Sequence, residues 1–159
     1  MGEIVLVDTS VLMNVLDVRG FNQNREPVLV EFERLIEQGA HLFLPMAAVL
    51  EAGNHIAQLA DGRVRRSTAE LFAERIRQAL DGEAPWRPMQ FPESETMATW
   101  LDEFPDAAMK GLGIGDLSIQ KDWEALCERH PLSPVRVWTL DSDLAGFLLL
   151  HKPSVIAEI

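Results

Sequence analysis

Four consecutive apolar residues, Ile4-Val5-Leu6-Val7, strongly limit what this chain can fold into, and the run stops abruptly at Asp8. An apolar run of this length, rich in β-branched residues, is typical of a strand that is buried on both faces. Such strands occur in parallel sheets that helices cover on both sides. We therefore expect a helix-covered sheet that contains residues 4–7.

Helical and strand-like patterns alternate along the rest of the chain. Helices are expected near residues 10–17, from Pro27 to Gly39 and from Pro45 onward, and strands at 42–44 and 135–140. This alternation predicts a parallel α/β sheet joined by right-handed crossovers. At 159 residues the chain has the usual size of one domain. The predicted fold is a single domain over residues 1–159, a three-layer α/β/α sandwich with a central, mostly parallel twisted sheet.

A helical hairpin between Asp61 and Phe104 is predicted beside this sheet. Asp61-Gly62 is expected to end the helix that starts at Pro45, and Leu50 belongs to the buried stripe of that helix. We interpret Ser67 with Glu70 as the capping box that starts the next helix.

The second half of the chain is expected to begin with a loop from Gly82 to Pro92, with Trp86 exposed between prolines. A helix over 94–104 follows, with an inward face. After a glycine-rich turn, a sixth helix carries an apolar face, and residues 155–159 are a possible edge strand. The inward residues expected on these two helices are Met97, Trp100, Leu101, Ile119, Trp123, Leu126 and Cys127.

Composition excludes several classes of protein. Hydrophobic residues make up 47% of the chain, which excludes a disordered acidic tail, and no apolar run approaches the roughly 18 residues that span a bilayer. We expect no membrane association and no signal peptide, and the single Cys127 fits a reducing cytoplasm. The net charge of −11 argues against a general nucleic-acid binder. It argues less against an enzyme with an acidic site, because bound cations reverse the local field.

Asp8 and Asp141 each follow a predicted strand. In sheets of this kind ligands bind beyond the carboxyl ends of the strands, so the two carboxylates are candidates for one site. Taken singly, each is also explained as the N-cap of the helix that follows, because Asp is a favoured N-cap residue.

Two further acids lie on predicted helices. Glu51 borders the apolar stripe of its helix, and the ordinary alternative is a partly exposed glutamate whose stem snorkels outward. Asp116 lies in the first turn of the sixth helix, three residues before Ile119, and the ordinary alternative is a favourable interaction with the helix dipole. None of the four acids is specific by itself.

Four short motifs, taken in order, resemble the PIN-domain family. They are Val-Asp-Thr-Ser at 7–10, Val-Leu-Glu-Ala at 49–52, Gly-Ile-Gly-Asp-Leu-Ser-Ile at 113–119, and Thr-Leu-Asp-Ser-Asp at 139–143. The resemblance covers almost the whole chain and implies a PIN-like fold. It also implies an acidic pocket that binds Mg²⁺ or Mn²⁺ and cleaves RNA. Many small bacterial members are VapC-type toxins that an antitoxin protein holds inactive, so the expected partners are RNA, a possible antitoxin and a second copy in a homodimer.

The chemistry of phosphodiester cleavage explains why such a pocket carries carboxylates. Mg²⁺ prefers oxygen ligands and keeps several waters, and metal-activated water attacks phosphorus in line with the leaving oxygen. In this interpretation Asp8, Asp116 and Asp141 are ligands, and Glu51 is a ligand or the general base. The auxiliary residues, which orient the carboxylates or assist them, are Asp143, Ser10 and Thr139.

The densest basic patch comprises Arg63, Arg65 and Arg66. A run of this kind is usually a solvated face, and it is also the best candidate for contacts to the RNA backbone.

Three other classes of protein compete with this interpretation. A phosphatase of the haloacid-dehalogenase kind needs a second Asp two residues after Asp8, where this chain has Ser10. An adhesion-type metal site needs a serine at Leu12. The serious alternative is a PIN-like domain that has become a non-catalytic binding or scaffold module, against which stands the presence of all four acids.

Overall fold

The computed structural model describes residues 2–142 and 144–145. Helices and strands alternate along them, as the sequence predicts. In chain order the elements are β1 (Ile4–Val7), α1 (Thr9–Val15), α2 (Arg25–Glu37), β2 (His41–Leu44), α3 (Met46–Ala57), α4 (Gly62–Leu80), β3 (Trp86–Pro88), α5 (Ser94–Met109), α6 (Ile114–Arg129) and β4 (Val135–Trp138).

The four described strands form one parallel sheet in the order β3-β2-β1-β4. Strand β1 lies inside it and pairs with β2 on one side and β4 on the other. All four β1 residues are buried, which confirms the prediction drawn from the apolar run at 4–7.

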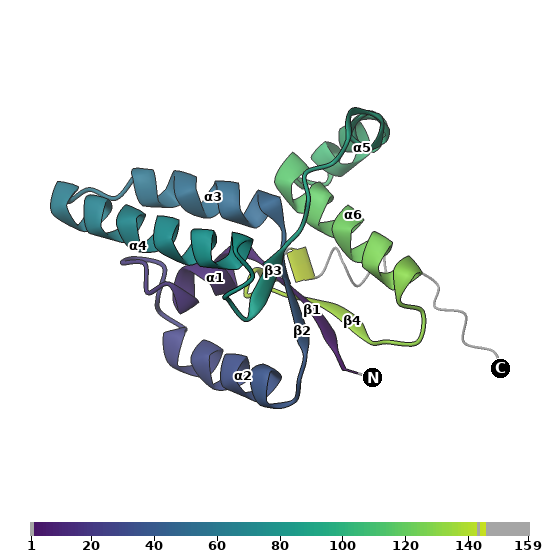
Figure 1. The fold of residues 1–159 in the computed structure, drawn as a ribbon. Helices are drawn as coiled ribbons and strands as arrows, with labels where there is room; N and C mark the ends of the chain where they lie inside the picture. The colour runs from purple at the N-terminus through teal and green to yellow at the C-terminus, as the bar shows by residue number, and fades with distance from the viewer. Residues whose placement is uncertain (1, 143, 146–159) are drawn as a thin grey trace.

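Helices cover both faces of the sheet, so the three-layer α/β/α fold is confirmed (Figure 1). Val5 and Val7 face a core built with α1, α2, α3 and α4. Ile4 and Leu6 face a second core built with α5 and α6. This alternation of side chains along one strand explains why β1 is apolar at every position. In the described part of the chain, no helix has both the length and the apolar character needed to cross a membrane.

A helical hairpin is present as expected, but α4 forms it with α3, and the two lie side by side in Figure 1. The expected bounds of Asp61 to Phe104 are wrong, because α5 packs against α6 instead. Asp61 caps α4, because its side chain accepts hydrogen bonds from the backbone of Arg63 and Val64. The capping box at Ser67 is therefore wrong, since the cap at Asp61, six residues earlier, lets the helix start sooner. Leu50 is 55% exposed, so its place in the buried stripe was also wrong.

The expected loop at 82–92 contains strand β3, whose Trp86 is 4% exposed and packs against Phe32. Both expectations for this segment, an irregular loop and an exposed tryptophan, are wrong. Strand β3 lies at the edge of the sheet, where a proline such as Pro88 is tolerated because one side of the strand needs no N–H donors.

Helix α5 continues past Phe104 and through Pro105 to Met109. Buried Ala107 anchors this last part to the core below α6. Of the three side chains expected to point inward, Trp100 is buried, whereas Leu101 is 55% exposed and Met97 is 37% exposed.

Strand β4 ends at Trp138, earlier than the expected 140. The Thr139 hydroxyl donates a hydrogen bond to Asp8 and the Leu140 backbone N–H donates to Ser10, so these residues do not continue the pairing with β1. The possible strand at 155–159 lies outside the described residues.

Candidate active site

The four acids expected from the sequence approach one another at the carboxyl edge of the sheet. Asp8 directly follows β1, and Asp141 lies three residues beyond β4, which pairs with β1 in parallel. Helices α3 and α6 contact each other and carry Glu51 and Asp116. We call Asp8, Glu51, Asp116 and Asp141 the acidic site.

Asp8 is the most buried of the four, with 4% of its surface exposed. It occupies the N-cap position of α1, but its side chain makes no capping hydrogen bond there. Its Oδ2 instead accepts hydrogen bonds from Thr139 Oγ1 at 2.7 Å and Ser10 Oγ at 3.1 Å. Burial raises the pKa of Asp8, and the charge of Glu51 adds to this, while the hydrogen bonds offset part of the rise. The helix-cap interpretation therefore does not account for this side chain.

Ser10 and Thr139 join the two strand ends around Asp8. The Leu140 backbone N–H donates to Ser10 Oγ at 2.9 Å, and the Asp141 backbone N–H donates to Thr139 Oγ1 at 3.0 Å. Each hydroxyl thus accepts from the loop after β4 and donates to the same carboxylate oxygen. The geometry agrees with the orienting role expected of both residues.

Glu51 projects from the middle of α3 and is held from two sides. Thr9 Oγ1 donates to its Oε2 at 3.1 Å, and His55 Nε2 lies 3.4 Å from its Oε1. Phe21 stacks on the His55 ring with centroids 4.8 Å apart. The Glu51 side chain is 48% exposed, which agrees with the partly exposed glutamate of the ordinary alternative. Sequence reasoning gave His55 no role, although its i+4 spacing from Glu51 indicated the contact.

The pKa of Asp116 is raised in part because the other three acids lie near it. Its half-buried carboxyl has a pKa raised to about 6, first by loss of solvent and then by repulsion from Asp8, Glu51 and Asp141. The helix dipole at the start of α6 would act in the opposite direction. Asp116 nevertheless lies in the first turn of α6, so the helix-dipole alternative is supported alongside its place in the acidic site.

Asp141 keeps a capping role as well. Its Oδ1 accepts a hydrogen bond from the Leu144 backbone at 3.3 Å, and its carbonyl accepts from Ala145. The N-cap alternative for this residue is thus supported alongside its place in the acidic site. Asp143 lies outside the described residues.

The basic patch of Arg63, Arg65 and Arg66 lies in the first turn of α4, beyond the end of α3. Glu51 is six residues before that end, so at 1.5 Å per residue the patch is roughly 9 Å or more from it along the helix axis. Arg65 donates to the Leu59 carbonyl, and Arg66 pairs with Glu70. The structure therefore does not bring the patch into the acidic site.

A cavity of about 490 Å³ adjoins the acidic site, and we call it the α3–α6 cavity. Glu51 and Asp116 line it together with apolar side chains that include Phe91 and Met97. A fifth acid, Asp122, also lines this cavity and was missed by sequence reasoning. The signal was present, because Asp122 stands three residues after buried Ile119 and so borders the inward face of α6.

The acidic site offers only hard oxygen donors, which are the ligands that Mg²⁺ and Mn²⁺ prefer. The raised pKa values of Asp8 and Asp116 mean that these carboxylates lack a compensating positive charge, which a divalent cation would supply. Within residues 2–142 and 144–145, no group of three or more His, Cys, Asp and Glu side chains forms a ready-made metal site. Mg²⁺ reaches many of its ligands through water, so the residues present fit the ion by charge and donor type.

No known family model and no curated protein matches the chain. Its fold is similar to that of a chain in the crystal structure of VapBC2 from Rickettsia felis bound to a DNA fragment from their promoter. The similarity has a TM-score of 0.50 and 13% sequence identity, and it covers 86% of this chain and 99% of that chain. It agrees with the expected PIN-like fold, and at this identity it shows the fold alone.

Proposed function

We propose that this protein is a Mg²⁺- or Mn²⁺-dependent ribonuclease of the cytoplasm that cleaves RNA phosphodiester bonds with water. The observation that carries the proposal is the gathering of Asp8, Glu51, Asp116 and Asp141 at the carboxyl edge of the sheet, close enough for the other three charges to help raise the pKa of Asp116. Carboxylates that repel one another at the carboxyl edge of a parallel sheet are expected where a cation binds.

We assign each residue of the acidic site a role in metal binding or catalysis. Asp8, Asp116 and Asp141 would hold the cation, with Glu51 as a further ligand or as the general base. The bound cation supplies acidification of the attacking water and charge stabilisation at the phosphate. Ser10 and Thr139 keep the Asp8 carboxylate in one orientation through their hydrogen bonds.

Glu51 is the group we assign to accept a proton. Its exposed carboxylate is fixed by Thr9 and His55, so it can face a water in the α3–α6 cavity without rotating away. In the hydrolysis, the water oxygen bonds to phosphorus and the water proton passes to Glu51. The phosphorus–oxygen bond of the leaving group breaks, and the leaving oxygen takes a proton from solvent water.

The direct test is cleavage of structured and unstructured RNA with Mg²⁺ or Mn²⁺, with and without a chelator. Asp8→Asn, Asp116→Asn and Asp141→Asn should each lower the rate by orders of magnitude, and Asp143→Asn, the matched control, by less. A larger loss in Asp143→Asn than in Asp141→Asn would overturn the assignment of the fourth acid. If RNA binds but is not cut under any of these conditions, the protein is a non-catalytic PIN-like module.

The proposal extends to partners. The similar structure contains VapBC2 with promoter DNA, and we propose that this chain likewise acts as a toxin that an antitoxin protein restrains, with a homodimer as its assembly. Co-expression with the product of a short neighbouring gene, followed by size-exclusion chromatography and cleavage assays, tests this. An inhibited complex is the expected result, and an unrestrained ribonuclease in the presence of every such product would contradict it.

Arg63, Arg65 and Arg66 remain proposed contacts to the RNA backbone, outside the acidic site. Replacing all three with Gln should weaken RNA binding and lower the slope of log affinity against log salt by about one unit or slightly less for each lost contact. The affinity for Mn²⁺ should stay unchanged. An unchanged salt slope would mean that the patch is only a solvated face.

A further inference from the structure

A second cavity, of about 570 Å³, lies between the β2–β3 edge and helices α5 and α6, and we call it the α5–α6 cavity. Gln90, Pro92, Trp100 and Asp122 line both this cavity and the α3–α6 cavity beside the acidic site. The two hollows are therefore neighbours along α6. A strand of RNA held at the acidic site has a second recess within reach.

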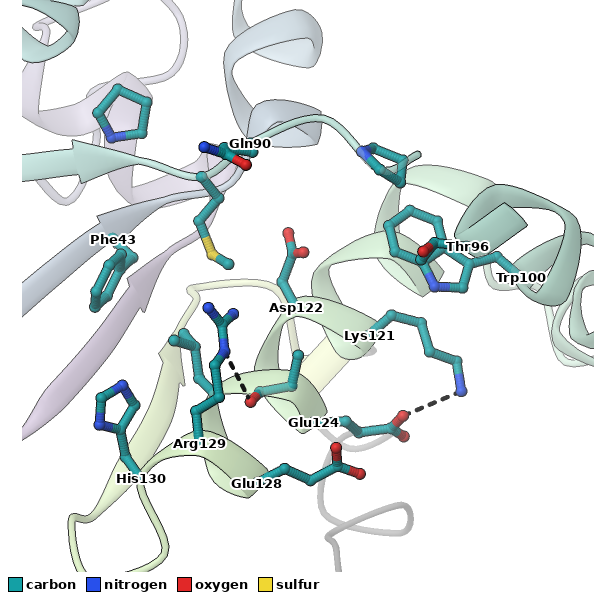
Figure 2. A pocket seen from close by; sticks show the side chains of 15 residues that line it. Phe43, Gln90, Thr96, Trp100, Lys121, Asp122, Glu124, Glu128, Arg129 and His130 are labelled. Atoms are coloured by element: carbon teal, nitrogen blue, oxygen red, sulfur yellow. Dashed lines mark hydrogen bonds and ion pairs between the residues drawn. The ribbon is translucent and has the colours of Figure 1, made fainter. Parts of the chain in front are cut away.

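Asp122 is the central polar group of the α5–α6 cavity. Figure 2 shows its carboxylate directed toward Gln90, with Phe43 and His130 on one side and Thr96 and Trp100 on the other. Burial raises the pKa of Asp122 to about 6, and the charge of Arg129 lowers it only in part. Among the described residues, no hydrogen bond or ion pair reaches this carboxylate. A partly buried carboxylate without donors is costly, so a ligand that supplies N–H groups would be favoured here.

The other charged groups of this cavity are already engaged or stand at its rim. Glu124 accepts hydrogen bonds from Gln120 and Lys121. Arg129 donates to the Ala125 carbonyl, and Glu128 is exposed (Figure 2). Asp122 is consequently the carboxylate best placed to select what enters.

We propose that the α5–α6 cavity receives a guanine base of the RNA substrate and that Asp122 selects it, an inference that rests on the proposed ribonuclease function. Guanine presents two adjacent donors, N1–H and the N2 amino group, which match the two oxygens of a carboxylate. Cytosine and adenine place one amino donor beside a ring nitrogen that repels a carboxylate, and uracil places one N–H between two carbonyls. Proteins commonly read single-stranded RNA in this way, with a base between aromatic side chains and hydrogen bonds to its Watson–Crick edge.

The spacing along α6 links this recess to the cleavage site. Asp116 and Asp122 are six residues apart, which is about 9 Å of helix. The selected guanine and the bond to be cut therefore belong to neighbouring nucleotides. Gln90 can add a donor and an acceptor to the base edge, and its amide lies above Asp122 in Figure 2.

The first arm of the test maps cleavage positions in a single-stranded RNA pool of random sequence, with the metal-loaded protein. Wild type should cut at a fixed distance from guanine, and Asp122→Asn should lower the preference for guanine about tenfold, because one amide oxygen cannot accept both donors. Ala125→Leu, which narrows the same cavity without touching a charge, should reduce it as well. Asp102→Asn, the same change at an exposed position on α5, is the matched control and should keep the preference.

The second arm measures binding of guanosine, adenosine, cytidine and uridine 5′-monophosphates by calorimetry, which needs no cleavage. Guanosine monophosphate should bind most tightly to wild type and lose that advantage in Asp122→Asn. Selective binding without any RNA cleavage would support the base pocket and overturn the ribonuclease function. Cleavage with no guanine preference, together with equal binding of the four mononucleotides, would overturn the base pocket and leave the ribonuclease function standing.

Discussion

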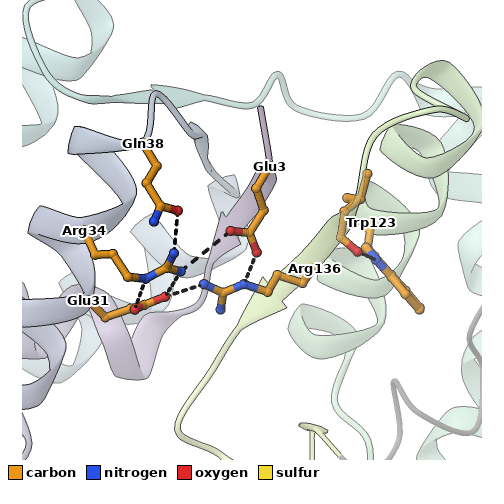
Figure 3. A network of polar contacts seen from close by, with 7 residues as sticks. Glu3, Glu31, Arg34, Gln38, Trp123 and Arg136 are labelled. Atoms are coloured by element: carbon orange, nitrogen blue, oxygen red, sulfur yellow. Dashed lines mark hydrogen bonds and ion pairs between the residues drawn. The ribbon is translucent and has the colours of Figure 1, made fainter. Parts of the chain in front are cut away.

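The two ends of strands β1 and β4 differ in the charges that they bring together. At the amino end, Glu3 and Glu31 alternate with Arg34 and Arg136 in one network (Figure 3). Arg136 donates to both glutamates, and Arg34 donates to Glu31 at 2.7 Å. The hydrogen bond from Arg34, with the charges of both arginines, lowers the pKa of Glu31. At the carboxyl end of the same strands, like charges are gathered and the pKa values of Asp8 and Asp116 are raised.

This difference is the one we expect between a region that only stabilises the fold and a region that binds the proposed cation. A fold that only had to be stable would mix opposite charges at both ends, as the amino end does. The carboxyl end instead keeps repelling carboxylates in place with hydrogen bonds from Thr9, Ser10 and Thr139. Local arrangements that oppose stability are expected at functional sites.

The largest expected effect is the response to metal, which should belong to the carboxyl end alone. A ligand bound only by the folded state adds about 2.7 kcal/mol at 100 times its dissociation constant, or roughly 5–10 °C in Tm for a domain of this size. Differential scanning calorimetry with Mn²⁺ or Mg²⁺ should show this rise for wild type and for Glu31→Gln, and little of it for Asp116→Asn. If neither ion changed the wild-type Tm, the carboxyl end would not differ from the amino end in binding a metal.

The next effect is on the metal-free protein, where Asp116→Asn should raise stability although we expect it to lower activity. A pKa of about 6 in place of 3.8 opposes folding above pH 6 by at most about 3 kcal/mol. Solvent screening at this half-buried position leaves an expected gain of about 1 kcal/mol. Protonation of Asp116 relieves the penalty in wild type, so the advantage of the variant should shrink as the pH falls through 6 and vanish below about 4.

Urea unfolding in chelator, repeated from pH 8 to pH 4, measures this difference. Asp102→Asn serves as the control, since it removes an equivalent charge from an exposed position outside the acidic site. An Asp116→Asn protein less stable than wild type at pH 7 would show that the carboxyl end is not strained by its charges.

The sequence predicted the sheet and the four acids because both depend on local pattern plus one topological rule. The apolar run at 4–7 required a buried strand, and parallel strands bring their carboxyl ends to one edge, so Asp8 and the loop after β4 had to meet. The face of α6 that Asp116 occupies follows from its spacing to buried Ile119, and its role as a metal ligand stays a prediction.

What the sequence did not predict depends on contacts between distant segments. Strand β3 is short and proline-flanked, and its Trp86 becomes buried only by pairing opposite Leu42 and packing on Phe32. The exposure of Leu50 follows from the open α3–α6 cavity, which periodicity within α3 does not reveal. The surroundings of Asp122 likewise arise from the segment around Gln90 and from α5, which are far from it in the sequence.

At the amino end, Arg136→Met should destabilise the protein by about 1 kcal/mol, because it removes hydrogen bonds that join β4 to Glu3 and Glu31 at a partly buried position. Arg66→Met is the matched control. Its pair with Glu70 spans a single turn of α4 and both side chains are exposed, so its loss should cost only a few tenths of a kcal/mol. Equal effects of the two substitutions in urea unfolding would mean that the amino-end network contributes no more than an ordinary surface pair.

The smallest expected effect is the pH dependence of that network. The pKa of Glu31 is lowered in the folded protein, chiefly by the Arg34 hydrogen bond, so Glu31 contributes stability above its unfolded value of 4.5 and loses it as the pH falls through the lower folded value. Because solvent reaches much of this side chain, we expect Glu31→Gln to cost about 0.5 kcal/mol at pH 7 and nothing near pH 2. Glu33→Gln, at an exposed position of the same helix, should show no such difference. At pH 7 Glu31→Gln should be less stable than wild type, whereas Asp116→Asn should be more stable. Both differences should disappear as the pH falls, so the stabilities of the two variants should approach that of wild type from opposite sides. If both variants were more stable than wild type at pH 7, or both less stable, the two ends of the sheet would not differ in the way their charges indicate.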